Sequence, residues 1–219
     1  MKVLFSVEFY EPQKGGAEEV VKQLAERLSQ KGHHVTVATT HIQARTTAVI
    51  NGVTVEGFAL SGSLIRGIAG TEKEIERYQT FLKGDFDIIV NYATQIWTTD
   101  LAFPVLESIA AKKILVSCGY TLKDEKHREY FEGMPKHLVK YDNIVYMSEE
   151  YHDKAFHHNP VIKGKAVIIP NGAAAEEFLA VPAIHIKKEL GITTPILRYV
   201  YPITTEQKDM IWLLMHLKK

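Results

Sequence analysis

The sequence predicts an α/β protein: an open, mostly parallel, doubly wound (Rossmann-like) sheet with helices on both faces and a β-hairpin excursion. Three observations lead to this class. Apolar runs of strand length alternate with amphipathic helical patterns from the first residue onward. A glycine pair, Gly15 and Gly16, separates the first strand from the first helix, and Asn51-Gly52 stands between two apolar runs, as in a hairpin turn. Such alternation favours parallel strands joined by right-handed crossovers.

The first sixty residues contain a βαβ unit followed by the hairpin. Residues 1–7 read as a buried strand, and residues 17–30 carry apolar side chains at helical spacing. Gly32 is placed to cap this helix at its C-terminus. Residues 34–39 form the second strand, and the hairpin spans residues 48–60. The hairpin therefore adds an antiparallel pair to an otherwise parallel sheet.

The middle of the chain continues the alternation. Residues 61–70 are rich in Gly and Ser and are predicted to be a mobile loop. Thr71 and Glu74 form a capping box that opens a helix ending near residue 82. The later elements are strands at 86–91, 113–118, 143–147 and 165–169, and helices at 99–111, 119–140 and 148–157. Pro104 is expected to kink the first of these helices.

The tail differs from the rest of the chain. It carries a helical stretch at 186–190, a strand at 196–201 and a helix at 206–217, the pattern of an opening βα unit. We assign residues 1–180 to one Rossmann-like domain and residues 181–219 to the start of a truncated second domain or a docking tail. An apolar face on the last helix is expected to pack on its own sheet or on a second copy of the chain.

Composition excludes several classes of function. The 26 basic and 26 acidic residues cancel, so the chain lacks the charge of a nucleic-acid-binding protein. No apolar run approaches the ~20 residues of a membrane span, and we expect a cytoplasmic protein. Cys118 is the only cysteine, which rules out an intrachain disulfide and a cysteine-based zinc site. The ten histidines are scattered, so no metal site is predicted.

The carboxyl ends of the strands are where open parallel sheets bind ligands. Gly15 and Gly16 lie there at the start of the first helix, whose free N–H groups and dipole favour an anion. Lacking Cβ atoms, they let the backbone approach a phosphate closely. A tight strand-to-helix turn without a ligand is the alternative.

Four local signals occur together in a fixed order. They are Gly15-Gly16-Ala17-Glu18 opening a helix that ends near Lys31-Gly32-His33-His34-Val35; Phe86-Asp87-Ile88-Ile89; Val145-Tyr146-Met147-Ser148-Glu149; and Ile169-Pro170-Asn171-Gly172 followed by Phe178. In this order and spacing the chain resembles the group 1, or family 4, glycosyltransferases, which have the two-Rossmann-domain GT-B fold. The resemblance covers about residues 1–200.

The resemblance implies transfer of a sugar from a nucleotide-sugar donor to a glycan, lipid-linked or small acceptor, with retention at the anomeric carbon. It implies no obligatory metal and no cofactor besides the nucleotide-sugar substrate. The N-terminal domain would mainly hold the acceptor, while Gly15 and Gly16 would reach the donor diphosphate. Asn171 and Gly172 would lie at the junction between domains.

Acceptor-binding residues are expected after the later strands. Asn91, Tyr92 and Gln95 offer hydrogen-bonding groups for sugar hydroxyls, and Trp97 could stack on a pyranose face. The alternative is an ordinary polar loop with the tryptophan packed beneath it.

A departure from the family pattern follows the next strand, because Cys118 stands where the family usually has a histidine near the transferring sugar. A thiol is a weaker hydrogen-bond donor than imidazole, so either the role is lost or Tyr120 serves it. A small buried apolar side chain at a strand end is the plainer interpretation of Cys118.

The family's donor-binding domain would follow residue 200, where only nineteen of the 219 residues remain. We therefore expect an acceptor-binding half that does not turn over alone and that self-associates or needs a separate donor-domain partner. The alternative is a noncatalytic nucleotide-binding or assembly module with the same sheet. Residues 123–140 combine five basic and four acidic residues with Tyr130, Phe131 and Met134. This favours a solvated face, with weak contact to the inner face of a membrane as the alternative.

Overall fold

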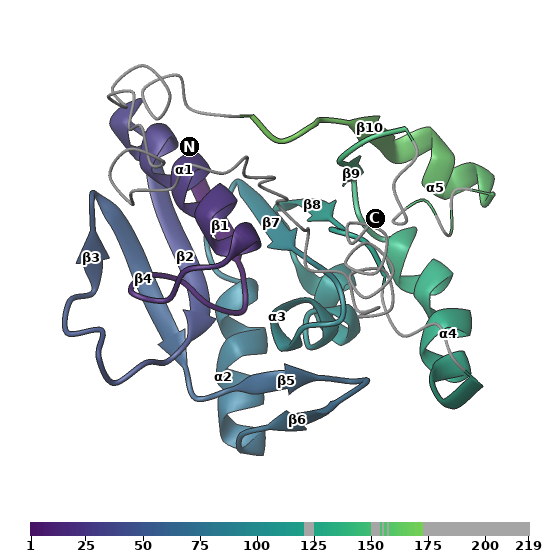
Figure 1. Cartoon of the computed structure of the whole chain (residues 1–219), viewed down its shortest axis with the longest axis horizontal. Coiled ribbons are helices and arrows are strands. Elements are labelled where there is room, and N and C mark those ends of the chain that lie inside the picture. Colours follow the sequence, from purple (N-terminus) through teal and green to yellow (C-terminus); the bar gives the residue numbers. More distant parts are fainter. Residues whose placement is uncertain (121–124, 150–153, 155, 157, 173–219) are drawn as a thin grey trace, which may run out of the picture. The chain divides into compact units, whose positions relative to one another are not determined.

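Strands and helices alternate in the computed structural model as the sequence predicts (Figure 1). The structure describes residues 1–120, 125–149, 154, 156 and 158–172. The strands are β1 (Lys2–Ser6), β2 (His34–Thr40), β3 (Val49–Ile50), β4 (Val53–Phe58), β5 (Ser61–Ser63), β6 (Gly67–Ala69), β7 (Ile88–Tyr92), β8 (Lys112–Val116), β9 (Asn143–Tyr146) and β10 (Ala166–Ile168). The α-helices are α1 (Gly16–Gln30), α2 (Glu72–Leu82), α3 (Trp97–Asp100), α4 (Arg128–Leu138) and α5 (Pro160–Lys165), and the 3-10 helices are η1 (Phe103–Ser108) and η2 (Glu125–His127).

Strand order confirms the doubly wound sheet. Among the described residues, eight strands form one sheet in the order β10-β9-β8-β7-β1-β2-β4-β3. Neighbouring strands are parallel except for the antiparallel pair of β3 and β4. From β1 the chain builds outward through β2 and β4, then crosses to β7 on the other side of β1. The switch point between β1 and β7 is where such sheets bind ligands at their carboxyl edge.

Helices cover both faces of the sheet. Along β1, Val3 and Phe5 belong to the core beneath α1, whereas Leu4 belongs to the core shared with α2, α3, η1, α4 and α5. This alternation follows from the two-residue side-chain period of a strand. On α1, Val21 and Ala25 form the buried stripe. The expectation of two helical layers is confirmed.

The ends of α1 explain the first βαβ unit. Gly15 is the N-cap residue, and Gly32 follows the helix with φ +84°, in the left-handed region that favours glycine. The N–H groups of Gly32 and His33 donate to Ser29 and Leu28 carbonyls at 2.9 and 3.1 Å. The predicted glycine cap is therefore confirmed.

The Asn51-Gly52 hairpin is also confirmed. Both residues have positive φ, 49° and 81°, as a type I′ turn requires. They join β3 to β4 with Ile50 opposite Val53. Ser29 of α1 donates its hydroxyl to the Gly52 carbonyl at 2.9 Å, which ties the turn to the first helix.

Residues 61–70 form a second hairpin, so the prediction of a loop without secondary structure is wrong. β5 and β6 pair antiparallel, with Ser61 opposite Ala69 and Ser63 opposite Gly67. Gly62 has φ +90°, and a Cβ there would collide with the Gly67 carbonyl. Glycine thus allows two short strands to lie close together in a segment that lacks any apolar alternation.

The helix predicted at 99–111 is wrong in its bounds and type. The chain forms one turn of α-helix, α3, and then the 3-10 helix η1, with Pro104 in the first positions of η1. Proline has no N–H for an i−4 carbonyl, so it starts a new helix here instead of kinking a long one. The start of α2 is as predicted, since the Thr71 hydroxyl accepts from the Glu74 N–H at 3.3 Å.

Several predictions lie outside the described residues. They are the domain boundary at 180/181 and the elements of the tail, together with most of the helix at 148–157. In the part of the chain that is described, no helix has both the length and the apolar character needed to cross a membrane.

Candidate functional site

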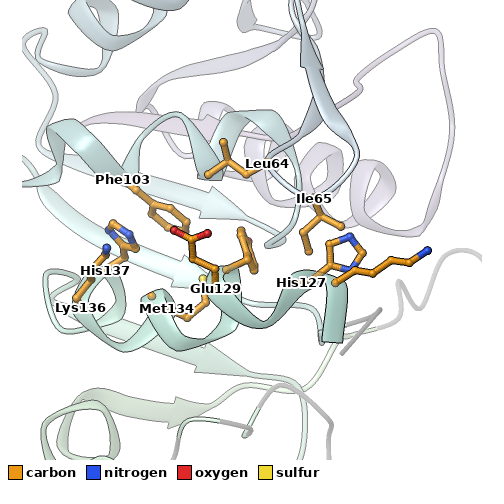
Figure 2. A pocket seen from close by; sticks show the side chains of 11 residues that line it. Leu64, Ile65, Phe103, His127, Glu129, Met134, Lys136 and His137 are labelled. Atoms are coloured by element: carbon orange, nitrogen blue, oxygen red, sulfur yellow. The ribbon is translucent and has the colours of Figure 1, made fainter. Parts of the chain in front are cut away.

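Two cavities are bordered by Ile65 at the tip of the β5–β6 hairpin, and the smaller of them lies beyond the carboxyl ends of β7 and β8. The smaller has a volume of about 230 Å³ and is lined by Ser63, Ile65, Arg66, Thr94, Gln95, Ile96, Cys118 and Gly119. The larger, of about 390 Å³, lies between the hairpin tip, η1 and α4. Figure 2 shows Leu64 and Phe103 on one side of it and Glu129 and Met134 of α4 on the other.

Unusual backbone conformations concentrate around the smaller cavity. Ala93, Gln95 and Cys118 have φ of 74°, 60° and 55°, in the left-handed region that side chains other than glycine rarely adopt. Each such residue costs on the order of 1–3 kcal/mol unless its surroundings hold it. Strain of this kind clusters at functional sites. The strained backbone conformations and the cavity therefore indicate the same candidate site.

Thr94 holds the two strained loops together. Its N–H donates to the Ser117 carbonyl at 3.2 Å, and its hydroxyl lies 3.1 Å from the carbonyls of Ser117 and Gly119. These bonds join the loop after β7 to the loop after β8. They bring Gln95, 8% exposed, and the half-buried Cys118 to one cavity wall.

Arg66 is the charged residue among those that line the smaller cavity. Its Nη2 lies 3.4 Å from the Gln95 carbonyl and 3.8 Å from the Glu8 carboxylate, which follows β1. Burial raises the pKa of Glu8, and the Arg66 guanidinium opposes this rise. Because the Arg66 side chain is 57% exposed, the ion pair contributes less than about 1 kcal/mol to stability.

Asp100 is a buried carboxylate that contacts two residues of the larger cavity wall. It is 1% exposed and accepts from the Leu64 N–H and the Tyr130 hydroxyl, each at 2.8 Å. Burial raises the pKa of Asp100 from 3.8 to about 6, against the lowering effect of these two bonds. A raised folded-state pKa means that this group favours folding most below pH 3.8, and the contribution is lost as the pH rises through about 6.

The larger cavity has apolar and basic walls. His137 stacks on Phe103 with ring centroids 4.4 Å apart and an interplanar angle of 10°. Burial, aided by Lys136 and Lys140, lowers the pKa of His137 to about 4, so the imidazole is neutral at pH 7. The apolar residues of α4 that were candidates for membrane contact turn inward instead: Met134 is fully buried, and Tyr130 and Phe131 pack against the core.

The loop that leads to the glycine pair is fixed by Arg45. Its guanidinium donates to the carbonyls of Glu11, Tyr10 and Thr40 at 2.9 to 3.2 Å. Lys22 of α1 adds a 2.6 Å bond to the Glu11 carboxylate. The start of α1 is thereby anchored at the carboxyl edge of the sheet.

Neither glycine of the pair is required by the turn itself. Gly15 has φ −157°, an extended conformation open to any residue, and the three atoms nearest to a Cβ on it would all belong to the carboxylate end of the flexible Glu18 side chain. A Cβ on Gly16 would meet nothing within 4 Å. A tight turn therefore does not explain the two glycines.

The family model for Glycosyltransferase Family 4 matches residues 14–177, which is 164 of the 219 residues. The chain belongs to glycosyltransferase family 4. This confirms the family that the four sequence signals predict. No curated protein sequence matches the chain.

Solved structures show the same fold as this family 4 chain. Sucrose-phosphate synthase from Thermosynechococcus elongatus matches with a TM-score of 0.59 and 16% identity, over 87% of this chain and 52% of the synthase chain. A second solved chain of that synthase matches with a TM-score of 0.50 and 14% identity, over 87% of this chain and 96% of the other. The family 4 chain thus spans about half the length of the first synthase chain.

Of the five acceptor residues predicted for this family 4 domain, the structure brings two to the smaller cavity, Gln95 and Cys118. Cys118 is half-buried, so it is more accessible than a core residue. Tyr120 is 7% exposed and packs edge to face on Phe156, with ring centroids 5.1 Å apart. Its ring therefore belongs to the core.

Asn91 and Tyr92 do not contact the cavity, contrary to prediction. They are 1% and 2% exposed within β7, which has strands on both sides and cores on both faces. The Asn91 amide donates to the Ser6 hydroxyl at 2.6 Å and accepts from the Tyr141 hydroxyl at 2.9 Å. It crosslinks the core and is not offered to a ligand.

Trp97 is fully buried, so stacking on a sugar is wrong and packing beneath the loop is right. Its Nε1–H donates to the Thr40 hydroxyl at 2.8 Å, and its ring packs on Tyr78 and Phe58 with centroids 4.9 and 6.1 Å away. Asn171 and Gly172 are exposed beyond β10, and their role at a domain junction stays a prediction.

Sequence reasoning missed Arg66, Asp100 and Ser63. Arg66 and Ser63 lie on a hairpin that the sequence does not reveal, and Asp100 lies where the sequence suggests the start of a longer helix. The one available signal for Asp100 was an acidic residue next to the apolar run at 101–106. Within the described ranges, no three His, Cys, Asp or Glu side chains are grouped to hold a metal.

Proposed function

We propose that this chain is the acceptor-binding half of a glycosyltransferase that transfers a sugar from a nucleotide-sugar donor to a glycan, lipid-linked or small acceptor, with retention at the anomeric carbon. The smaller cavity carries this proposal. It lies where parallel sheets bind ligands, and its wall is held in strained backbone conformations that the surrounding bonds maintain. Its Gln95, Thr94 and Arg66 side chains are suited to a hydroxyl-rich molecule.

The donor side of the proposed reaction uses Gly15 and Gly16. Their small size leaves the backbone open at the start of α1, where N–H groups and the helix dipole favour a diphosphate. The anchoring of this loop by Arg45 supports such a role, since a preorganised loop loses little entropy on binding. We further propose that the transfer needs no obligatory metal and takes place in the cytoplasm.

A donor-binding domain is the partner that this proposal requires. Half of a cleft cannot enclose a nucleotide sugar and its acceptor from water. We propose that the second half is supplied by a further domain or by a separate polypeptide, and that the chain alone binds the acceptor without turnover.

A transfer assay tests the proposal. The full chain is combined with a family 4 donor-domain polypeptide, labelled nucleotide sugars and a panel of glycan, lipid-linked and small acceptors, and the anomeric configuration of the product is read by NMR. We expect a retained configuration. In Gln95→Ala we expect the acceptor KM to rise about tenfold, the equivalent of one lost hydrogen bond of about 1.4 kcal/mol. Gln30→Ala, an exposed glutamine at the far end of α1, is the matched control and leaves KM unchanged.

Two results would count against this function. Absence of both transfer and binding across the panel, with the donor domain present, contradicts it and leaves the noncatalytic nucleotide-binding or assembly module as the better account. Transfer that is equally efficient in Gln95→Ala and wild type would place the acceptor outside the smaller cavity.

A further inference from the structure

A buried carboxylate, that of Asp100, joins three elements that are distant in the sequence. Asp100 ends α3, its Oδ2 accepts from the Leu64 N–H at the hairpin tip, and its Oδ1 accepts from the Tyr130 hydroxyl on α4. Both distances are 2.8 Å, and the residue is 1% exposed. Bonds to an ionised carboxylate are stronger than neutral ones, and burial shields them from competing water.

The helix that presents Asp100 is itself rigidly held. Trp97, Thr98 and Thr99 are fully buried. The Thr99 hydroxyl donates to the Ala93 carbonyl at 2.5 Å, and the Tyr78 hydroxyl donates to the Thr98 carbonyl at 2.6 Å. Asp100 therefore projects from a fixed base toward the tip of the hairpin.

The hairpin tip is held by the Leu64–Asp100 bond and by Arg66, which contacts the Gln95 carbonyl and the Glu8 carboxylate, while Ile68 of β6 packs against the core. The two strands of the hairpin have three residues each, and an isolated two-stranded hairpin is marginal in water. Leu64 and Arg66 at the tip are exposed, whereas Ser63 is fully buried. Between Leu64 and Arg66 lies Ile65, which lines both cavities. The position of the tip therefore determines where the smaller cavity ends and the larger cavity begins.

We propose that Asp100 is a positioning residue of the acceptor site: it fixes the hairpin tip to α3 and α4, so that Ile65 stays as the wall between the smaller and the larger cavity. By holding this wall, Asp100 sets the size and shape of the acceptor that the site accepts. The effect on the acceptor rests on the proposed function, whereas the hold on the hairpin does not.

Amide exchange tests the hold on the hairpin without any ligand. In the full chain, Asp100→Ala is expected to speed hydrogen exchange of the Leu64 N–H by about tenfold or more, because its acceptor is removed. Trypsin cleavage after Arg66 is expected to speed up in parallel. Asp100→Asn keeps an oxygen for Leu64 and an amide that can donate to Tyr130, so exchange should return to within about threefold of wild type.

Asp142→Ala is the matched control. Asp142 also accepts from a backbone N–H at 2.8 Å, that of Lys113. This bond lies at the amino-terminal end of β8, away from the hairpin tip. Asp142→Ala should leave Leu64 exchange unchanged. Unchanged Leu64 exchange in folded Asp100→Ala would overturn the proposal. If that variant does not fold, Asp100→Ser takes its place, since a hydroxyl cannot reach both partners, and the same two outcomes apply.

The transfer assay tests the consequence for the acceptor. Asp100→Ala is expected to raise the acceptor KM about tenfold with kcat within about twofold, and Asp100→Asn is expected to restore KM. If kcat fell together with a rise of KM in both variants, the positioning role would be overturned. Absence of transfer in wild type would instead be a failure of the proposed function, and the exchange result would still decide whether Asp100 holds the hairpin.

Discussion

Replacing Trp97 with alanine should lower the free energy of unfolding by about 4 kcal/mol, the usual cost of removing a large core aromatic. The side chain is fully buried, packs on Tyr78 and Phe58, and donates to the Thr40 hydroxyl at 2.8 Å. Alanine would leave a cavity and would remove the bond that the Thr40 hydroxyl accepts, although this hydroxyl would still donate to the Leu60 carbonyl at 2.9 Å. For a chain of this size the melting temperature should fall by roughly 10 °C. Urea unfolding followed by circular dichroism measures the change.

Trp97→Phe is the control, because it keeps an aromatic ring and loses only the indole N–H and part of the volume. We expect it to cost about 1–2 kcal/mol. A Trp97→Ala protein with unchanged stability but weakened acceptor binding would contradict the core assignment. It would restore the stacking role that the sequence suggests.

Replacing Asn91 with alanine should lower the free energy of unfolding by about 3 kcal/mol. This large effect is expected although the sequence predicts that Asn91 is a polar residue of the acceptor-binding loop. Its amide bridges the Ser6 and Tyr141 hydroxyls, and all three residues are at most 1% exposed. Alanine would leave both hydroxyls buried without their amide partner. Chemical unfolding of the variant checks the prediction.

Asn143→Ala is a suitable comparison, since Asn143 is an exposed asparagine at the start of β9. It should change stability by less than about 0.5 kcal/mol. If Asn91→Ala were equally mild, the amide bridge would not be a structural crosslink, and a role for Asn91 in binding would be open again.

Local signals predicted the frame of the fold well. Gly32 and Asn51-Gly52 require left-handed backbone conformations that few residues adopt, so their positions follow from the sequence alone. The strands β1, β7 and β8 each contain three consecutive apolar residues, at 3–5, 88–90 and 114–116, as expected for strands of a sheet covered on both faces. The β5–β6 hairpin has no such signal, because Gly62 serves close approach to the Gly67 carbonyl and Gly67 a positive φ of 90°, and neither glycine contributes to a hydrophobic face.

The sequence predicts some residues of the candidate site and misses others, and the difference has a physical reason. The rule that ligands bind after strands located Gln95 and Cys118, which do line the smaller cavity. The same rule failed for Asn91, because a polar residue near a strand end can satisfy buried partners as well as a ligand. Arg66 and Asp100 reach the site through contacts between distant segments, Arg66 with Glu8 and Asp100 with Tyr130, and no local pattern reports such contacts.

The thiol of Cys118 allows the most direct test of the claim that the smaller cavity binds the acceptor. It is the only cysteine of the chain and is half-buried in the cavity wall. The measurement is its alkylation rate with iodoacetamide, with and without an acceptor whose binding is shown by calorimetry, and with free N-acetylcysteine as the reagent control. At about ten times Kd we expect the rate to fall about tenfold, following the fraction of unbound protein. An unchanged Cys118 rate with the acceptor bound would contradict the account.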